Sequence, residues 1–163
     1  GQGTVGLEIL EQCPSVATVF VPAGGGGLVS GVSAAIKGMR SGVRIVGVEP
    51  EGAAKISRSR EAGHPVTLDH VSSIADGLLA VRPGDLTFEH VQTLVNDVIT
   101  VSDDQIRAAV RWLFAVANLV AEPSGAAAVA GALATRSSGD GTSVAIVSGG
   151  NVDPVAYASY ISQ

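Results

Sequence analysis

The chain has 163 residues, of which 46% are hydrophobic and only 15% are charged, and its formal net charge is −5. This length allows one ordinary domain with a sizeable core. The acidic balance, without a cluster of Lys or Arg, argues against nucleic acid as a partner. No apolar run reaches the length of a membrane span. The single cysteine, Cys13, forms no internal disulfide, which suits a cytoplasmic protein.

Short β-branched runs alternate with helical patterns along the chain. In chain order, we predict helix 4–12, strand 17–22, helix 27–40, strand 43–48, helix 53–62, an irregular stretch 63–86, helix 87–95, strand 97–101, a helix from an N-cap at 102 to about 120, helix 124–134, strand 143–147 and a final helix. This alternation predicts an α/β fold, a doubly wound, mostly parallel sheet with helices on both faces.

Four consecutive glycines, Gly24 to Gly27, lie between the first predicted strand and the next helix. Residues without Cβ atoms let backbone N–H groups converge on an anion at the positive end of a helix. Each glycine would destabilise a regular element by roughly 0.5–1 kcal/mol relative to alanine, and a simple turn needs only one or two. The run therefore predicts a phosphate cradle.

Two nucleotide-binding loops also contain such glycines. A Walker loop ends in Gly-Lys-Ser/Thr, whereas here Gly27 precedes Leu28, so hydrolysis of nucleoside triphosphates is disfavoured. The dinucleotide fingerprint fits at Gly25 and Gly27, but Ser30 replaces its third glycine. Glu49 ends the next strand, about where a ribose-binding acid would lie. A nicotinamide-binding Rossmann module therefore stays open beside a small phosphorylated cofactor.

The last predicted strand ends directly in Ser148-Gly149-Gly150-Asn151. Ligands of an open parallel sheet lie beyond the carboxyl ends of its strands, so this hydroxyl and the tetraglycine run are predicted to share one site. A ring could hydrogen-bond to Ser148 while meeting little side-chain bulk at the two glycines. The simpler interpretation of Ser148 is a helix N-cap or a turn serine.

Five motifs carry a resemblance to a known family. They are Gly1-Gln2-Gly3-Thr4, Gly24-Gly25-Gly26-Gly27-Leu28, Ile74-Ala75-Asp76-Gly77, Glu122-Pro123-Ser124-Gly125-Ala126 and Ser148-Gly149-Gly150-Asn151-Val152-Asp153. With these motifs in this order, the whole chain resembles the threonine/serine dehydratase and serine racemase branch of the fold-type-II pyridoxal-phosphate enzymes. The resemblance implies pyridoxal 5'-phosphate as cofactor, an amino acid such as threonine or serine as substrate, and a homo-oligomer.

The resemblance also implies a role for each matching residue. The segment Gly24–Leu28 would bind the cofactor phosphate, and Gly77 would lie along the ring. Ser148 would hydrogen-bond to the pyridine nitrogen, with Gly149 beside it. Glu122 would lie near the cofactor as the candidate catalytic residue of this chain, although the proline after it equally fits the start of a new helix.

A serine at the pyridine nitrogen has a chemical consequence. Unlike a carboxylate, a neutral hydroxyl cannot hold a proton on that nitrogen, so the ring withdraws electrons less strongly and a carbanion at the substrate Cα is short-lived. This setting favours rapid loss of a β-hydroxyl and disfavours transamination. We therefore predict β-elimination from L-threonine or L-serine, which yields an α-keto acid and ammonia. An amino-acid racemase of the same family is the alternative.

The chain departs from the family pattern in its lysines. The family forms a Schiff base with a lysine in an upstream Ser-x-Lys motif, whereas Lys37 and Lys55, the only lysines, lie outside such a context; both are predicted to be solvated at the surface. We therefore expect a fragment, with residues 1–163 forming a single partial domain, the C-terminal part of the large cofactor-binding domain. Its partner would be the missing N-terminal half, without which it would be inactive; a non-catalytic remnant is the other alternative.

Some members of the family bind a divalent cation. The resemblance places the first positions of that site at Glu49 and at the backbone of Ala53. The family's acidic third ligand falls on Lys55, whose ammonium group cannot ligate a metal and would instead take the cation's place beside Glu49. We therefore predict no bound metal there.

Overall fold

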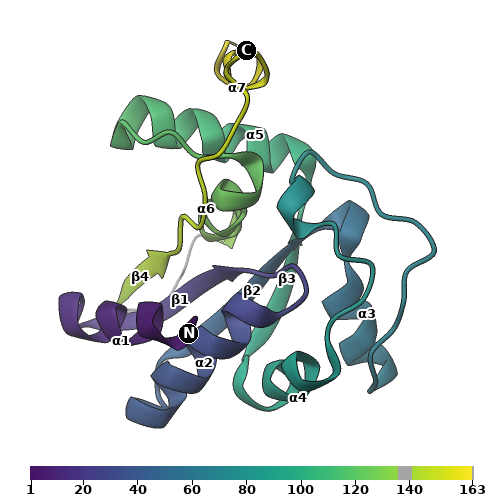
Figure 1. The fold of residues 1–163 in the computed structure, drawn as a ribbon. Helices are drawn as coiled ribbons and strands as arrows, with labels where there is room; N and C mark the ends of the chain where they lie inside the picture. The colour runs from purple at the N-terminus through teal and green to yellow at the C-terminus, as the bar shows by residue number, and fades with distance from the viewer. Residues whose placement is uncertain (136–140, 163) are drawn as a thin grey trace.

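Four parallel strands form the centre of the computed structural model, which describes residues 1–135 and 141–162 (Figure 1). The strands are β1 (Val16–Pro22), β2 (Arg44–Pro50), β3 (Asp97–Val101) and β4 (Thr142–Ala145), and their order in the sheet is β3-β2-β1-β4. The chain moves outward from β1 through β2 to β3 and then crosses back to the far side of β1. The parallel α/β sheet predicted from the sequence is confirmed, and its topological switch point lies between β1 and β4.

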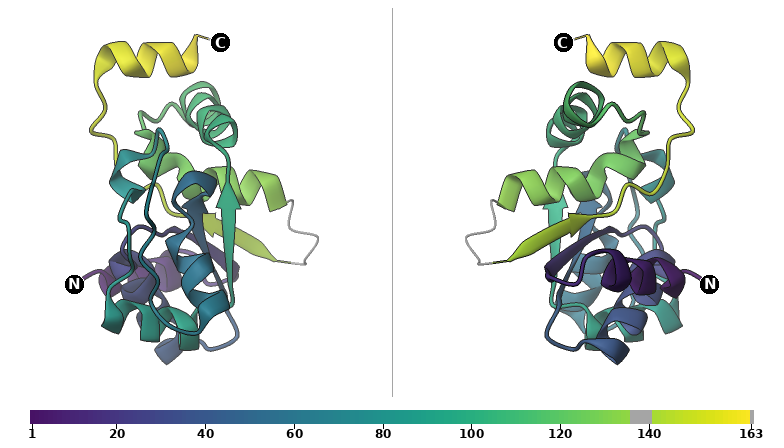
Figure 2. Two further views of the ribbon diagram at one scale, coloured as in Figure 1. Left: turned by 90° about the vertical axis from the view of Figure 1, so that its right-hand side faces the viewer. Right: turned by 90° about the vertical axis from the view of Figure 1, so that its left-hand side faces the viewer.

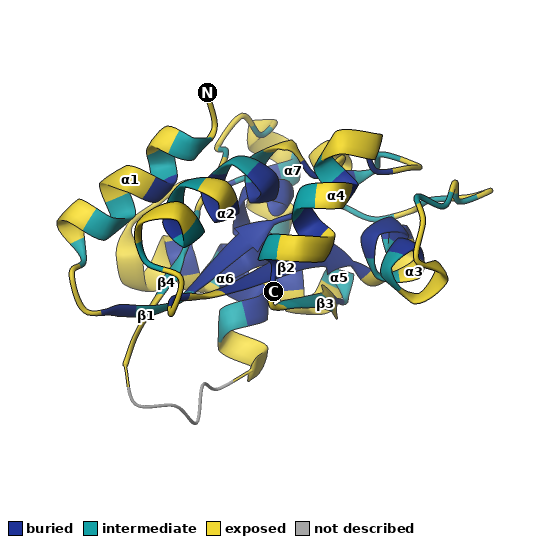
Figure 3. Cartoon of the chain, turned by 90° about the horizontal axis from the view of Figure 1, so that it is seen from below, coloured by how far each residue is buried: buried dark blue, intermediate teal, exposed yellow. Residues whose placement is uncertain are grey.

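One face of the sheet is covered by α1 (Gly3–Gln12), α2 (Gly27–Met39), α3 (Lys55–Ala62) and α4 (Asp85–Leu94), as Figure 3 shows from that side. Successive strand residues point to opposite faces. Val19 and Val21 therefore pack with Val32 and Ile36 of α2 on this face, while Phe20 packs on the other.

The opposite face is covered by α5 (Asp103–Trp112) and α6 (Pro123–Thr135), and α7 (Pro154–Ile161) packs against α5 at the outer edge (Figure 2). Helix α6 lies between the sheet and α5, and it is buried from Pro123 to Gly131. A Cβ atom at Gly131 would lie 2.8 Å from a methyl carbon of Val48. This close approach explains the alanine-rich sequence of α6, since larger side chains would push the helix off the sheet.

Two predicted helices differ from those observed. The predicted capping box of α5 is present, because the Ser102 hydroxyl accepts from the Gln105 N–H and the Gln105 side chain accepts from the Ser102 N–H. The helix nevertheless ends at Trp112 and not near 120, because Leu113–Ala117 forms a wider π turn and Asn118 then adopts a left-handed conformation, with φ of 53°. The predicted helix 53–62 is a 3₁₀ turn followed by α3.

The long segment between α3 and α4 runs over the carboxyl ends of the strands. It contains a 3₁₀ turn at Asp76–Leu78. Asp103 holds it, because the carboxylate accepts from the Ser73 hydroxyl and from the Ile74 N–H. The irregular stretch predicted over 63–86 therefore has a fixed course that brings Gly77 to the edge of the sheet where ligands bind. In the part of the chain that the structure describes, no helix is both long enough and apolar enough to cross a membrane.

Candidate functional site

The tetraglycine loop connects the end of β1 to the first turn of α2. Gly26 has a φ of 96°, a left-handed conformation that favours glycine, and α2 begins at Gly27 without a side-chain cap. Within the described residues, the backbone N–H groups from Gly24 to Leu28 donate to no protein acceptor. These donors lie at the positive end of the α2 dipole, so the loop offers hydrogen bonds to an anion.

The loop is held in place by α4. The Gly25 carbonyl oxygen accepts from the Thr87 hydroxyl at 2.7 Å and from the Gly84 N–H at 3.2 Å. A Cβ atom at Gly26 would lie 2.8 Å from the Thr87 Oγ1. At Gly25 and Gly27, in contrast, a Cβ atom would meet nothing within 4 Å. The loop is therefore tightly packed on the α4 side, and the space beside Gly25 and Gly27 is open.

A cavity of about 430 Å³ lies between this loop and the end of β4. Its lining consists of Gln2, Val5, Gly27, Leu28, Ile146, Val147 and Ser148. The cavity is at the switch point between β1 and β4, where open parallel sheets bind ligands. The structure thus brings the start of α2 and Ser148 to one space, as the sequence predicts.

Ser148 does not cap the last helix. The N-cap of α7 is Asp153, whose Oδ1 accepts from the N–H groups of Val155 and Ala156, both at 2.9 Å. Ser148 is exposed, and its hydroxyl has no protein hydrogen-bond partner in the described part of the chain. The helix-cap interpretation of Ser148 is therefore wrong, and its hydroxyl is available to a ligand.

The start of α6 packs against Gly149. The Glu122 N–H donates to the Gly149 carbonyl oxygen at 3.1 Å, and a Cβ atom at Gly149 would overlap the Glu122 carboxylate. Helix α6 begins at Pro123, so the new-helix interpretation of this motif is right, while Glu122 itself is half-buried beside Gly149. A side chain at this position would have to displace the Glu122 carboxylate.

Contacts with α6 and with the tetraglycine loop hold Gly77 in the same region. Its N–H donates to the Ser124 hydroxyl oxygen at 2.9 Å, which ties it to α6. A Cβ atom at Gly24 would lie 3.3 Å from the Gly77 carbonyl oxygen, so the tetraglycine loop packs directly against it. Residues from four motifs that are far apart in the sequence therefore surround one region at the carboxyl edge of the sheet.

Lys55 is completely buried, so its predicted position at the surface is wrong. Its Nζ donates to the carbonyl oxygens of Ala23 at 2.9 Å, Ala53 at 3.1 Å and Leu78 at 2.9 Å. The other lysine, Lys37, is half-buried, and its ammonium group donates to two carbonyls after the end of α2. Sequence patterns place a lysine at the surface by default, and the backbone carbonyls that bind Lys55 leave no sequence signal.

Glu49 is also completely buried, and its Oε2 lies 3.6 Å from the Lys55 Nζ. Its carboxylate accepts from the N–H groups of Ile56 at 3.0 Å and Ser57 at 2.8 Å in the first turn of α3. Burial lowers the pKa of Lys55 below its ordinary value, and the Glu49 carboxylate partly opposes this shift. Because Glu49 is enclosed by these partners, it is not available to bind a ribose.

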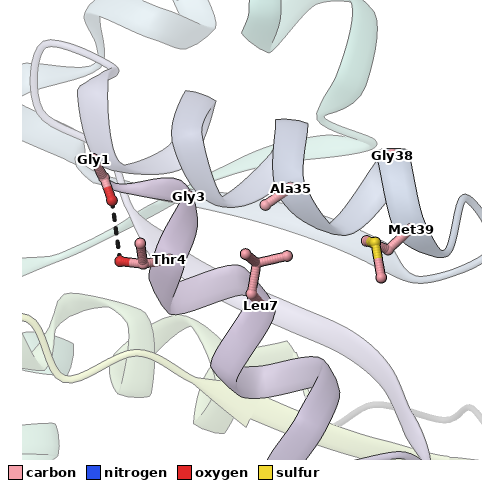
Figure 4. Close-up of a pocket in the computed structure, with 7 residues that line it drawn as sticks. All are labelled: Gly1, Gly3, Thr4, Leu7, Ala35, Gly38 and Met39. Atoms are coloured by element: carbon pink, nitrogen blue, oxygen red, sulfur yellow. Dashed lines mark hydrogen bonds between the residues drawn. The ribbon is translucent and has the colours of Figure 1, made fainter.

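A second cavity, of about 500 Å³, lies on the outer surface between α1 and α2 (Figure 4). Its lining consists of Gly1, Gly3, Thr4, Leu7, Ala35, Gly38 and Met39. The Thr4 hydroxyl donates to the Gly1 carbonyl oxygen, and the side chains of Leu7 and Met39 are exposed. This groove is lined by the N-terminal segment and α2 and by no strand end, whereas the cavity beside Ser148 lies at the switch point between β1 and β4, so that cavity is the better candidate site.

A family model described as "Pyridoxal-phosphate dependent enzyme" matches residues 1–149. L-threonine ammonia-lyase from Thermotoga maritima is 44% identical over 154 residues, which cover 94% of this chain and 38% of that protein. Serine racemase from Oryza sativa subsp. indica is 44% identical over 159 residues, which cover 94% of this chain and 47% of that protein. The processed form of threonine deaminase isoform 2 from Solanum lycopersicum has a TM-score of 0.94 at 38% identity, over 99% of this chain and 48% of that one.

These similarities confirm the resemblance that the five motifs carry. The chain spans less than half of each of these three proteins. The shared cofactor of the family is pyridoxal phosphate, so the nicotinamide-binding alternative is wrong. The family model and the structural match to a solved threonine deaminase agree, and the chain belongs to the fold-type-II pyridoxal-phosphate dependent enzymes.

Proposed function

We propose that this chain forms the cofactor-binding part of an enzyme that releases ammonia from L-threonine or L-serine by β-elimination. One observation carries the proposal: Gly27 and Leu28, at the start of α2, and Ser148, after β4, line the same cavity of about 430 Å³. This volume is in the range of small-molecule sites. A molecule with a phosphate at one end and a ring nitrogen at the other matches the two groups.

The phosphate of the cofactor would bind to the tetraglycine loop. The N–H groups from Gly24 to Leu28 have no protein acceptor in the described structure, and they lie at the start of α2. A Cβ atom at Gly25 or Gly27 would extend into open space, so glycine at these positions leaves room for a bulky anion. The residues present therefore fit a phosphate group.

The ring of the cofactor would lie toward Ser148. When bound, pyridoxal phosphate supplies an electron-withdrawing ring that stabilises negative charge at the substrate Cα. The Ser148 hydroxyl can hydrogen-bond to the ring nitrogen without adding a charge. Gly77 and Gly149 would lie beside the ring, and their lack of side chains keeps that space free. Glu122, half-buried beside Gly149, is the candidate acid–base group of this chain.

The lysine that binds the cofactor covalently would be supplied from outside these residues. Lys55 is enclosed by three carbonyls and Glu49, and Lys37 donates to the carbonyls of Ser41 and Val43. The Lys55 amine is therefore enclosed, and Lys37 lies in the last turn of α2, at the opposite end of that helix from the tetraglycine loop. The curated relatives are longer than this chain, which agrees with a site completed by another segment.

β-Elimination is favoured over racemisation by the neutral hydroxyl at Ser148. Because Ser148 adds no charge at the ring nitrogen, the bound cofactor would stabilise negative charge at the substrate Cα only weakly, which would favour substrates whose β-hydroxyl leaves quickly. Relatives of both kinds, threonine ammonia-lyase and serine racemase, have the same identity to this chain. An assay that follows both products therefore decides between the two reactions.

The test uses the 163-residue chain and a fusion that adds the preceding residues of the Thermotoga maritima relative. We expect the chain alone to bind pyridoxal phosphate reversibly, with no adduct at Lys37 or Lys55 after borohydride reduction and mass spectrometry. The fusion should release keto acid from L-threonine, and the chain alone should not. Keto-acid release by the chain alone, or a stoichiometric adduct at either lysine, would contradict the proposal. With L-serine as the substrate, D-serine formed faster than keto acid would establish the racemase.

A further inference from the structure

The three carbonyl groups that bind Lys55 come from three separate segments. Ala23 immediately precedes the tetraglycine loop, Ala53 lies in the 3₁₀ turn after β2, and Leu78 directly follows Gly77. The ammonium group of Lys55 therefore joins the phosphate-binding loop to the segment that carries Gly77. We propose that Lys55 is a positioning residue for the cofactor phosphate, an inference that rests on the proposed function.

The geometry of the peptide bond explains how Lys55 would act on the loop. In a trans peptide the C=O and the following N–H point in opposite directions, and the described chain contains no cis peptide. Because the Ala23 carbonyl points toward Lys55, the Gly24 N–H points away from it. In the same way, the Gly25 carbonyl points toward Thr87 on α4, so the Gly26 N–H points away from α4.

Lys55 and Thr87 thus fix alternate peptides of one loop from its packed side. Each interaction directs the following N–H group away from its own anchor, and within the described residues no protein acceptor takes either N–H group. A glycine loop without such contacts would sample many conformations, and ordering it on binding would weaken the affinity. Lys55 would therefore raise phosphate affinity by holding the donors in place before the ligand arrives.

The ammonium group suits this role because the number of its N–H donors equals the number of carbonyl acceptors around it. An ammonium group has three N–H donors, and Lys55 has three carbonyl acceptors. Glu49 compensates its charge without contacting the loop itself, since the carboxylate is held by the first turn of α3. Loss of the ammonium group would leave three buried carbonyls without that donor and would free the Ala23 peptide to rotate.

The experiment compares Lys55→Met with Lys37→Met in the 163-residue chain. Lys37 is the matched control because it also donates to two backbone carbonyls but lies at the far end of α2. Affinities are measured for pyridoxal phosphate, inorganic phosphate and pyridoxal, which lacks the phosphate. We expect Lys55→Met to weaken both phosphate ligands by about tenfold or more, which corresponds to one or two well-placed hydrogen bonds, and to leave pyridoxal unchanged. Lys37→Met should change none of the three.

The three ligands separate a positioning role from a structural one. If Lys55 had only a structural role, Lys55→Met would weaken the affinities for pyridoxal and pyridoxal phosphate equally. Either this result or an unchanged phosphate affinity in folded Lys55→Met would overturn the inference about Lys55 and leave the proposed function standing. If the unmodified chain binds neither pyridoxal phosphate nor phosphate, the proposed function fails with it. Circular dichroism establishes folding at the temperature used. Where Lys55→Met is unfolded, Lys55→Gln, which keeps two N–H donors on a neutral side chain, is measured at low temperature with the same expected difference between ligands.

Discussion

The ammonium group of Lys55 lies 3.6 Å from the carboxylate of Glu49, and neither side chain reaches solvent. Each group has further partners, three carbonyls for Lys55 and two N–H groups for Glu49. Such a pair is well satisfied as a unit, but each charge depends on the other for compensation. Removal of one partner leaves an isolated charge in the interior, which is more unfavourable than removal of both.

We expect Lys55→Met and Glu49→Leu each to lower the free energy of unfolding by about 3–5 kcal/mol, the usual effect of breaking a buried pair. The double variant should lose clearly less than the sum of the two single losses, because it buries no uncompensated charge. Urea unfolding of the four proteins in a double-mutant cycle measures the coupling. Additive losses would show that the two charges do not stabilise each other.

The lowered pKa of Lys55 predicts a pH dependence of stability. Between the folded pKa and the ordinary value of 10.5, the unfolded chain binds more protons at this residue than the folded chain does. The free energy of unfolding therefore rises with pH across that window, and the destabilising effect of burying the charge is fully present below it. Glu49 is the ion-pair partner that limits the shift.

Lys55→Met lacks this ionisable group and serves as the reference. Subtracting its unfolding free energy from that of the unmodified chain removes the contribution of the other titrating residues. The difference in unfolding free energy, unmodified chain minus Lys55→Met, should increase as the pH rises through the folded pKa of Lys55 toward 10.5. Urea unfolding at a series of pH values measures it. A difference that stays constant or falls would mean that the folded pKa of Lys55 is not lowered.

The glycines of the loop should differ in what they tolerate. Gly26→Ala combines a left-handed conformation with a contact at 2.8 Å to Thr87, so it should destabilise the protein by about 1–3 kcal/mol. Gly25→Ala places its methyl group in open space, so the melting temperature should hardly change while the affinity for pyridoxal phosphate falls. Thermal unfolding of the two variants measures the expected difference in stability, and ligand titration measures the expected loss of affinity. An unchanged phosphate affinity in Gly25→Ala would mean that the anion binds elsewhere.

Variants of Ser148 and Asp153 should have opposite effects on cofactor affinity and on stability. Ser148→Ala should weaken binding of pyridoxal phosphate by about 1–3 kcal/mol, because the ring nitrogen loses its partner, and should leave stability unchanged. Asp153→Ala removes the N-cap of α7 and should lower stability by about 1 kcal/mol without changing cofactor affinity. Ser148→Asp, which can hold a proton on the ring nitrogen, should slow elimination in the fusion protein. Equal affinities for the unmodified chain and both Ser148 variants would remove the electronic argument for elimination.

Much of this site was predictable because it follows from strand ends. The tetraglycine run and Ser148 each follow a β-branched run, and parallel sheets collect such ends at one edge. Even the cap of α7 has a sequence signal, since Asp153 precedes a proline at the first helical position. Lys55 and Thr87 had no such signal. Their partners are backbone carbonyls brought close by the irregular segment after α3, and no residue pattern encodes which carbonyl will face a buried amine.

The early end of α5 was equally hidden. The residues from Leu113 to Ala117 are apolar and include no Gly or Pro stop signal, so the sequence gives no sign that the helix ends there. The exposed side chain of Phe114 packs edge-on against Tyr157 of α7, with ring centroids 6.1 Å apart. Tertiary contacts of this kind decide where a helix ends when the sequence alone favours continuation.

The position of β4 beside β1 has a consequence for synthesis of the chain. Val19 pairs with Val144, which the ribosome adds only after β2 and β3 have been made. Until the ribosome has produced β4, the loop after β1 can already form, but one side of β1 is an open edge with unpaired backbone groups, a surface prone to association with other chains. The newborn chain therefore passes through a vulnerable interval, which ends when β4 emerges from the ribosome and docks beside β1.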